Sequence, residues 1–96
     1  MRPYKKEKVE EILHHAAAEF FRKESGPQSL LTVVGVNFDE KKKRAVILFS
    51  ILPVEKTKSA IDFIERQKRD FIDYLKKNTK MKIIPFISFE LSPIIA

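Results

Sequence analysis

The chain has 96 residues, contains no cysteine and carries a formal net charge of +6. This length fits one domain, and the lack of cysteine excludes disulfide bonds, thiolate metal sites and thiol nucleophiles. No stretch approaches the roughly 20 apolar residues that span a membrane, and the basic start Met1–Lys6 is not followed by the apolar core of a signal peptide.

The first element is predicted to be a helix from about Tyr4 to Glu24. Its apolar residues recur at the spacing of one helical face, and this stripe comprises Val9, Ile12, Leu13, Ala16, Ala17, Phe20 and Phe21. Pro3 suits a first helical turn, and the Gly26-Pro27 pair is a strong signal for the end of the helix.

An antiparallel hairpin is predicted over Leu30–Ile51, because two apolar, β-branched runs flank the charged segment Asp39–Lys43. Alternation predicts one apolar face made of Leu30, Thr32, Val34, Val36 and Phe38 on the first strand and Ala45, Ile47, Phe49 and Ile51 on the second. Pro53 is expected to end the second strand, since proline cannot donate to a ladder. A hairpin this apolar needs cover from the flanking helices.

A second helical region follows, with Thr57 or Ser59 as the expected N-cap and Asn78 near the end. Its apolar positions at helical spacing are Ile61, Ile64, Phe71, Ile72 and Leu75. Lys68 occupies a position where an unbroken stripe requires an apolar residue, and burial of an unpaired ammonium is costly. We therefore expect the helix to bend near Gln67, or Lys68 to lie at the edge of the buried face, with Lys68 and Arg69 in water.

The last element is predicted to be a strand over Ile83–Leu91, and Pro85 near its start indicates an edge position. The order helix, strand, strand, helix, strand describes an α+β fold with a mixed three-stranded sheet and its helices on one face. A right-handed crossover is expected to place the third strand parallel to the first, in the order third–first–second. We expect a single domain over residues 1–96, with loose ends at 1–3 and 92–96.

The sequence shows no pattern typical of an active site or a metal site. His14 and His15 are helix neighbours whose side chains diverge by about 100°, which favours surface histidines near Glu10 and Glu11 over metal ligands. Only two glycines are present, so there is no P-loop, no GxGxxG and no GXXG of ordinary KH domains. We expect no enzymatic activity, cofactor, metal or small-molecule substrate; a small hydrolase is a third alternative that no motif supports.

Basic residues gather in groups, which favours a polyanionic partner over a charge that only maintains solubility. One group is Lys41–Arg44 in the predicted hairpin turn, a second fills the polar break at Arg66, Lys68 and Arg69, and a third spans Lys76–Lys82. Spacing places six phenylalanines on core faces, whereas the opposite parity of Phe86 predicts exposure; the six are Phe20, Phe21, Phe38, Phe49, Phe71 and Phe89.

Several local strings, in order over nearly the whole chain, resemble the ribosome-binding factor A family. They are Lys8-Val9 with Leu13, Phe20–Glu24, Thr32–Val36 with Asp39, Arg44–Val46, and Lys80–Pro85 followed by Ile87–Phe89. The resemblance implies a type II KH-like fold with two later helices. In the family an Ala-x-Gly kink between these helices replaces the GXXG loop; here the matching positions are Gln67-Lys68-Arg69.

The resemblance also implies a non-enzymatic, RNA-binding assembly factor that assists maturation of the small (30S) ribosomal subunit and processing of its 16S rRNA. The implied partners are 16S rRNA and the immature 30S subunit. We also expect a monomer without a membrane partner or a cofactor, and the absence of cysteine favours a location in the cytoplasm. We expect the RNA-binding surface to comprise Lys5, Lys6, Lys8, Arg66, Lys68, Arg69, Lys76, Lys77, Lys80 and Lys82.

An alternative function is a protein-interaction module that does not bind RNA. The outer sheet face, predicted to carry Val33, Val46, Leu48 and Phe86, would bury against a partner or a second copy. Salt dependence separates the two functions, because phosphate contacts weaken steeply with salt whereas an apolar interface responds little.

Overall fold

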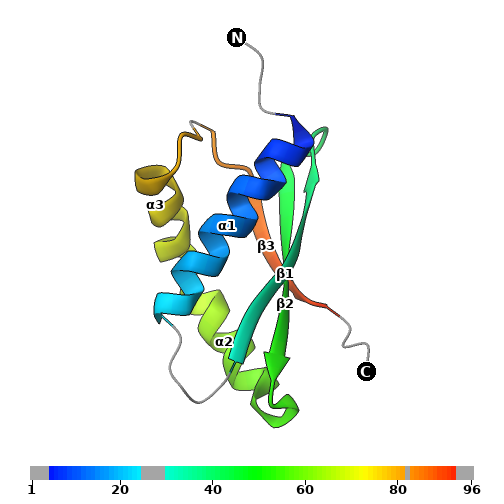
Figure 1. Ribbon diagram of the computed structural model, residues 1–96, viewed down its shortest axis with the longest axis vertical. Helices are drawn as coiled ribbons and strands as arrows, with labels where there is room; N and C mark the ends of the chain where they lie inside the picture. The colour runs from blue at the N-terminus through cyan, green and yellow to red at the C-terminus, as the bar shows by residue number, and fades with distance from the viewer. Residues whose placement is uncertain (1–4, 25–29, 82, 93–96) are drawn as a thin grey trace.

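The computed structural model describes residues 5–24, 30–81 and 83–92. Its elements are α1 (Lys6–Glu24), β1 (Leu30–Asp39), β2 (Arg44–Leu52), the 3-10 turn η1 (Val54–Lys56), α2 (Thr57–Arg66), α3 (Lys68–Asn78) and β3 (Phe86–Leu91). The helices cover one face of a mixed three-stranded sheet (Figure 1), which confirms the predicted α+β fold. The predicted helix start at Tyr4, the Gly26-Pro27 signal and the predicted loose ends 1–3 and 92–96, apart from Ser92, lie outside the described residues.

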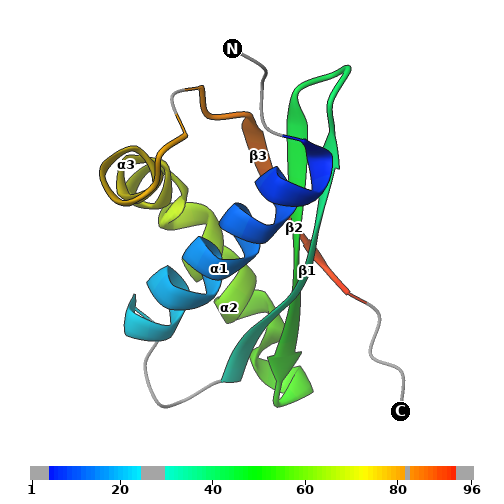
Figure 2. The same ribbon diagram turned by 45° about the horizontal axis from the view of Figure 1, so that its top comes forward.

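The apolar stripe predicted for the first helix is confirmed on α1, which packs against β1 and β2 (Figure 2). Six of its seven side chains are buried and Ile12 is half-buried against them. Glu10 makes a long-range bond from this helix to the sheet, because its Oε2 accepts from the Phe38 amide at 2.8 Å. The carboxylate therefore accepts a hydrogen bond from a backbone amide on the outer edge of β1, where no neighbouring strand supplies an acceptor.

The strand order predicted from the sequence is wrong. The sheet runs β1-β2-β3, with β1 antiparallel and β3 parallel to β2. A crossover connection joins parallel strands, and the chain enters this crossover from β2, so β3 is parallel to β2 and not, as predicted, to β1. The third strand therefore lies beside β2, with Ala45 opposite Ile87. The predicted edge position of β3 is confirmed.

Alternation along β1 is interrupted by a bulge, so the predicted apolar face is wrong for the first half of that strand. Val33 pairs with Phe49 and Gly35 with Leu48, which leaves Val34 as the extra residue. Val33 is consequently buried at 8% exposure, whereas Val34 is 46% exposed and Thr32 is also exposed. Beyond the bulge, Val36 and Phe38 face the core as predicted, and β2 buries Ala45, Ile47, Phe49 and Ile51.

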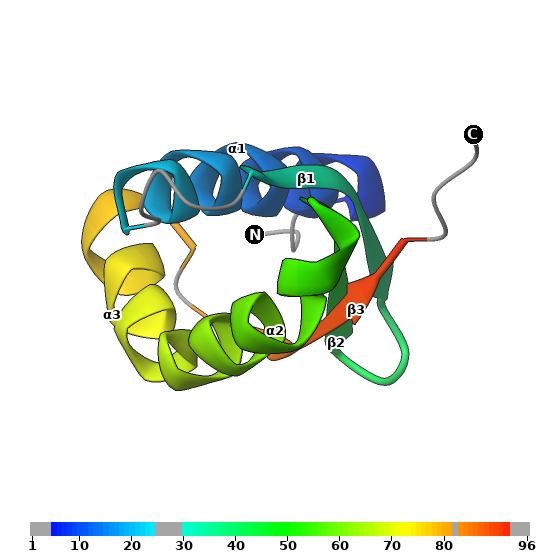
Figure 3. The ribbon, with the colours of Figure 1, turned by 90° about the horizontal axis from the view of Figure 1, so that it is seen from below.

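The second helical region is divided at Gln67, as the polar run predicted. The Gln67 amide donates to the carbonyls of both Phe63 and Ile64 at 3.1 Å, and α3 restarts with the Phe71 amide donating to the Gln67 carbonyl at 2.8 Å. Figure 3 shows α2 and α3 meeting at an angle. Neither Thr57 nor Ser59 caps α2, contrary to prediction. The helix follows η1 directly, and both hydroxyls donate backwards, to the carbonyls of Val54 and Lys56.

The last strand begins later than predicted, because Ile83 and Ile84 lie outside the ladder. Pro85 has no amide to donate, and pairing starts when the Phe86 amide donates to the Lys43 carbonyl at 2.9 Å. At the other end, the Ser92 amide donates to the Phe49 carbonyl at 2.7 Å. Asn78 ends α3 as expected.

An aromatic cluster joins the helices to the sheet. The Phe71 ring of α3 lies 5.5 Å from the rings of Phe20 and Phe21 and 6.2 Å from that of Phe89, centroid to centroid. Such tilted ring pairs add to the burial of their large apolar areas. The core therefore fixes α3, and the basic residues on it, relative to both α1 and β3.

Candidate nucleic-acid interface

The break between α2 and α3 presents the three basic residues predicted there. Arg66 ends α2, while Lys68 and Arg69 form the first turn of α3. Arg66 and Arg69 are exposed, as expected for phosphate-binding groups, but Lys68 is half-buried. The prediction that Lys68 lies fully in water is therefore only partly correct.

An open hollow collects basic side chains along the break and α3. It is lined by Glu65, Arg66, Lys68, Arg69, Ile72, Asp73 and Lys76. The fold thus brings Lys76, in the last turn of α3, to the same concavity as the break residues, and four cationic side chains and two carboxylates line it. Asp62 and Asp73 make no ion pair within the described residues, so the predicted orienting surface pairs are not formed.

Lys68 is turned toward an aromatic ring. Its Nζ lies 4.8 Å from the centroid of Phe86, and the guanidinium carbon of Arg44 lies 6.0 Å from the same centroid. Both distances fall within the range of cation–π attraction. Phe86 is 64% exposed, so the predicted exposure of this one phenylalanine is confirmed.

The remaining predicted residues after the break lie toward one end of the molecule. Lys76 and Lys77 occupy the last turn of α3, and Lys80 is exposed just beyond it. Lys82 lies outside the described residues. Figure 1 shows the end of α3, the start of α1 and the hairpin turn all toward the upper end of the molecule.

Lys5, Lys6 and Lys8 lie around the start of α1, away from the hollow along α3. Glutamates alternate with the lysines at this end of α1, and the Lys8 ammonium forms an ion pair with the Glu11 carboxylate at 3.5 Å. Contact between α1 and α3 is made at the opposite end of α1, where Phe20 meets Phe71 and Tyr74. The structure therefore separates the α1 lysines from the basic residues that line the hollow.

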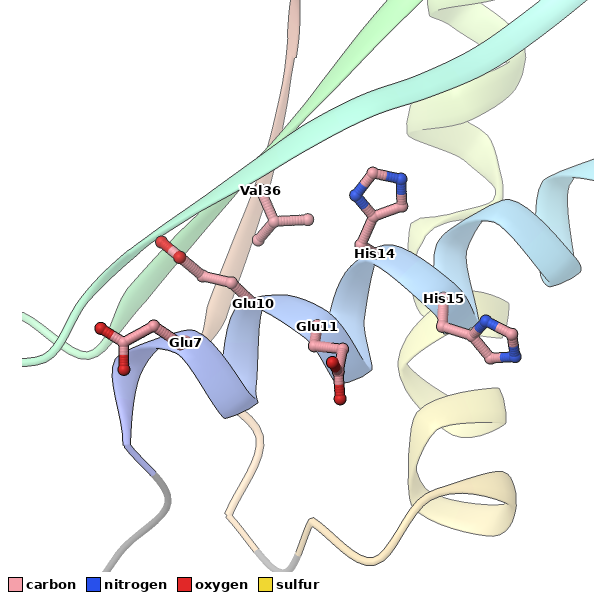
Figure 4. Close-up of a pocket in the computed structure, with 6 residues that line it drawn as sticks. All are labelled: Glu7, Glu10, Glu11, His14, His15 and Val36. Carbon is pink, nitrogen blue, oxygen red and sulfur yellow. The ribbon is translucent and has the colours of Figure 1, made fainter.

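A second hollow beside α1 is lined by Glu7, Glu10, Glu11, His14, His15 and Val36. Figure 4 shows Glu10 and His14 on the side that faces β1, while Glu11 and His15 point away from it. The two imidazoles diverge as predicted. Glu10 bonds the Phe38 amide and Glu11 pairs with Lys8, so the expected association of these glutamates with the histidines is not formed. No group of three metal-ligating side chains is found among the described residues.

The hairpin turn is ordered by Asp39. The Lys42 amide donates to Asp39 Oδ1 at 3.1 Å and the Lys41 amide at 3.0 Å. The bond from the Lys42 amide is the largest cause that lowers the pKa of Asp39. Desolvation opposes it, and the bond from the Lys41 amide and the positive charges of both lysines lower the pKa further. The turn closes with Lys43 at a φ of 54°, and Lys41, Lys42 and Lys43 are exposed.

The element order, with three helices on one face of a mixed sheet, defines a KH-like α+β domain. The crystal structure of ribosome-binding factor A from Thermus thermophilus has this fold, with a TM-score of 0.77 and 24% identity over 92% of this chain and 97% of that one. The solution NMR structure of a Thermotoga maritima protein, provisionally identified as a ribosome-binding factor A, gives a TM-score of 0.74 and 25% identity over 100% and 96%. The predicted resemblance to ribosome-binding factor A is thus confirmed.

No family model matches the chain, and no curated protein matches it. The similarity therefore rests on three-dimensional structure over nearly the whole of both chains. Within the described residues, no helix is long and apolar enough to cross a membrane.

Sequence reasoning did not place Arg44 and Phe86 beside Lys68. Charge clustering groups Arg44 with the hairpin lysines, and alternation predicts only that Phe86 is exposed on the outer sheet face. The two residues are partners in the parallel ladder of β2 and β3. Their proximity becomes predictable only with the correct strand order.

Proposed function

We propose that this protein is a non-enzymatic, RNA-binding assembly factor of the small ribosomal subunit that assists maturation of 16S rRNA in the cytoplasm. The observation that carries the proposal is the shared fold with a protein named for binding the ribosome, at a TM-score of 0.77 over 92% of this chain. The hollow along α3 supports it, because four cationic side chains converge there and guanidinium and ammonium groups bind phosphates. The protein acts as a monomer without a cofactor.

The salt dependence of RNA binding tests whether the break contacts phosphates. We expect Arg66→Gln with Arg69→Gln to weaken binding of RNA from the small subunit. The slope of log affinity against log salt should become shallower by about 0.7 to 0.9 for each phosphate that the variant no longer neutralises. Fluorescence anisotropy over a salt series measures both quantities.

A matched control removes the same charge elsewhere. Lys56 and Lys58 are exposed at the start of the second helical region, outside the proposed surface. Lys56→Gln with Lys58→Gln should leave the salt slope close to that of the wild type. Equal changes in both double variants would show that only net charge matters. RNA binding that hardly responds to salt would contradict the phosphate-binding surface itself.

A further inference from the structure

Phe86 holds a large apolar ring in solvent at a fixed place on the sheet. It is 64% exposed, yet its backbone opens β3, where its amide donates to the Lys43 carbonyl at 2.9 Å and its Cα pairs with that of Arg44. Its neighbour Ile87 is buried beneath the helices. The ring is therefore displayed by a hydrogen-bonded strand rather than by a loop.

Two cations from different elements flank this ring. Lys68 comes from the first turn of α3 and Arg44 from the start of β2, with their charged groups 4.8 Å and 6.0 Å from the centroid of Phe86. Neither cation has a carboxylate partner within the described residues. Their charges are thus available to a ligand, and Lys68 also lines the basic hollow along α3.

We propose that Phe86, Lys68 and Arg44 form a stacking site for an unpaired nucleobase of single-stranded RNA. This inference rests on the proposed function and specifies which part of the RNA is bound. An aromatic face accepts any base by stacking, and adjacent cations neutralise the phosphates on either side of it. Bases inside a duplex already stack on each other, so the site selects single-stranded segments.

The test compares a labelled uridine oligomer with an abasic ribose–phosphate oligomer of the same length and charge, by fluorescence anisotropy. Phe86→Leu should weaken binding of the uridine oligomer by about 5- to 150-fold, the range that removal of one stacked base implies. It should leave the abasic oligomer unaffected, since phosphate contacts persist. Phe86→Tyr retains the aromatic face and should bind as the wild type does.

Ile83→Ala provides the control, because Ile83 is a nearby apolar side chain with 78% exposure. This variant should bind both oligomers as the wild type does. Equal weakening for both oligomers in Phe86→Leu would overturn the stacking site, as would wild-type affinity for both.

The stacking site and the proposed function fail in distinguishable ways. If wild-type protein binds small ribosomal subunits but Phe86→Leu changes nothing, only the stacking site is wrong. If the wild type binds neither oligomer nor small subunits, both proposals fall together.

Discussion

Asp39 is the residue on which the geometry of the hairpin turn depends. Its carboxylate accepts from the amides of Lys42 and Lys41, which orders the turn whose last residue, Lys43, has a positive φ. These bonds favour the ionised carboxylate, and the pKa lies below its usual value of 3.8. The stabilisation is therefore fully present above the unfolded-state pKa and is lost as the pH falls through the lower folded-state value.

Replacing Asp39 by Asn removes this pH-dependent stabilisation but retains an oxygen that can accept the amides. We expect Asp39→Asn to be less stable than the wild type at neutral pH, with the difference shrinking as the pH falls below about 4. Urea unfolding at stepwise lower pH measures the difference. Glu40→Gln is the control, and its difference from the wild type should change little over the same range. A constant penalty for Asp39→Asn at every pH would contradict this role.

Glu10 ties α1 to the outer edge of β1 through the Phe38 amide, 28 residues along the chain. Truncation leaves this partly buried donor without its charged acceptor, so we expect Glu10→Ala to lower the free energy of unfolding by about 1 to 2 kcal/mol. Glu10→Gln should lower it less, because its amide oxygen can still accept.

Glu11→Ala is the control for the Glu10 variant. Glu11 makes only an exposed ion pair with Lys8, which contributes at most about 1 kcal/mol. Denaturant unfolding should therefore give a lower free energy of unfolding for Glu10→Ala than for Glu11→Ala. Equal stability of the two variants would mean that the bond to the Phe38 amide contributes nothing measurable.

At the scale of elements, the sequence predicted those that depend on local periodicity. The stripe on α1, the alternation of β2 and the break near Gln67 all follow from side-chain spacing and from the cost of burying Lys68. The sequence did not predict the bulge at Val34, because one extra residue shifts the alternation of buried and exposed side chains but does not change the apolar, β-branched composition of the strand. The N-cap of α2 was missed because η1 leads directly into the helix and its carbonyls attract the hydroxyl groups.

Gly35 follows the bulged residue, but the backbone there does not require glycine. A Cβ at this position would lie 3.8 Å from Leu48 Cδ1, an ordinary van der Waals contact, and no described glycine has a positive φ. We expect Gly35→Ala to leave stability unchanged or raise it by up to about 1 kcal/mol, because alanine restricts the unfolded chain. Thermal unfolding followed by circular dichroism measures the change. A marked fall in melting temperature would show that the bulge needs glycine.

At the scale of the whole molecule, the candidate interface is assembled by contacts distant in sequence. The group at the break could be predicted, because it is local. The hollow that adds Lys76 depends on the course of α3, and the cluster of Arg44, Lys68 and Phe86 depends on β3 pairing with β2. The predicted order, with the third strand beside the first, would have separated Phe86 from Arg44. A local pattern does not determine which strand a crossover returns to, so this part of the site required the structure.

Sedimentation of cell extract through a sucrose gradient tests the central claim, that the protein acts on the small ribosomal subunit, most directly. The account predicts that the protein travels with free or immature small subunits. It also predicts that Arg66→Gln with Arg69→Gln shifts the protein toward the top of the gradient at a salt concentration at which Lys56→Gln with Lys58→Gln remains bound. A protein that stays at the top of the gradient under all conditions, immature small subunits included, would contradict the proposed function.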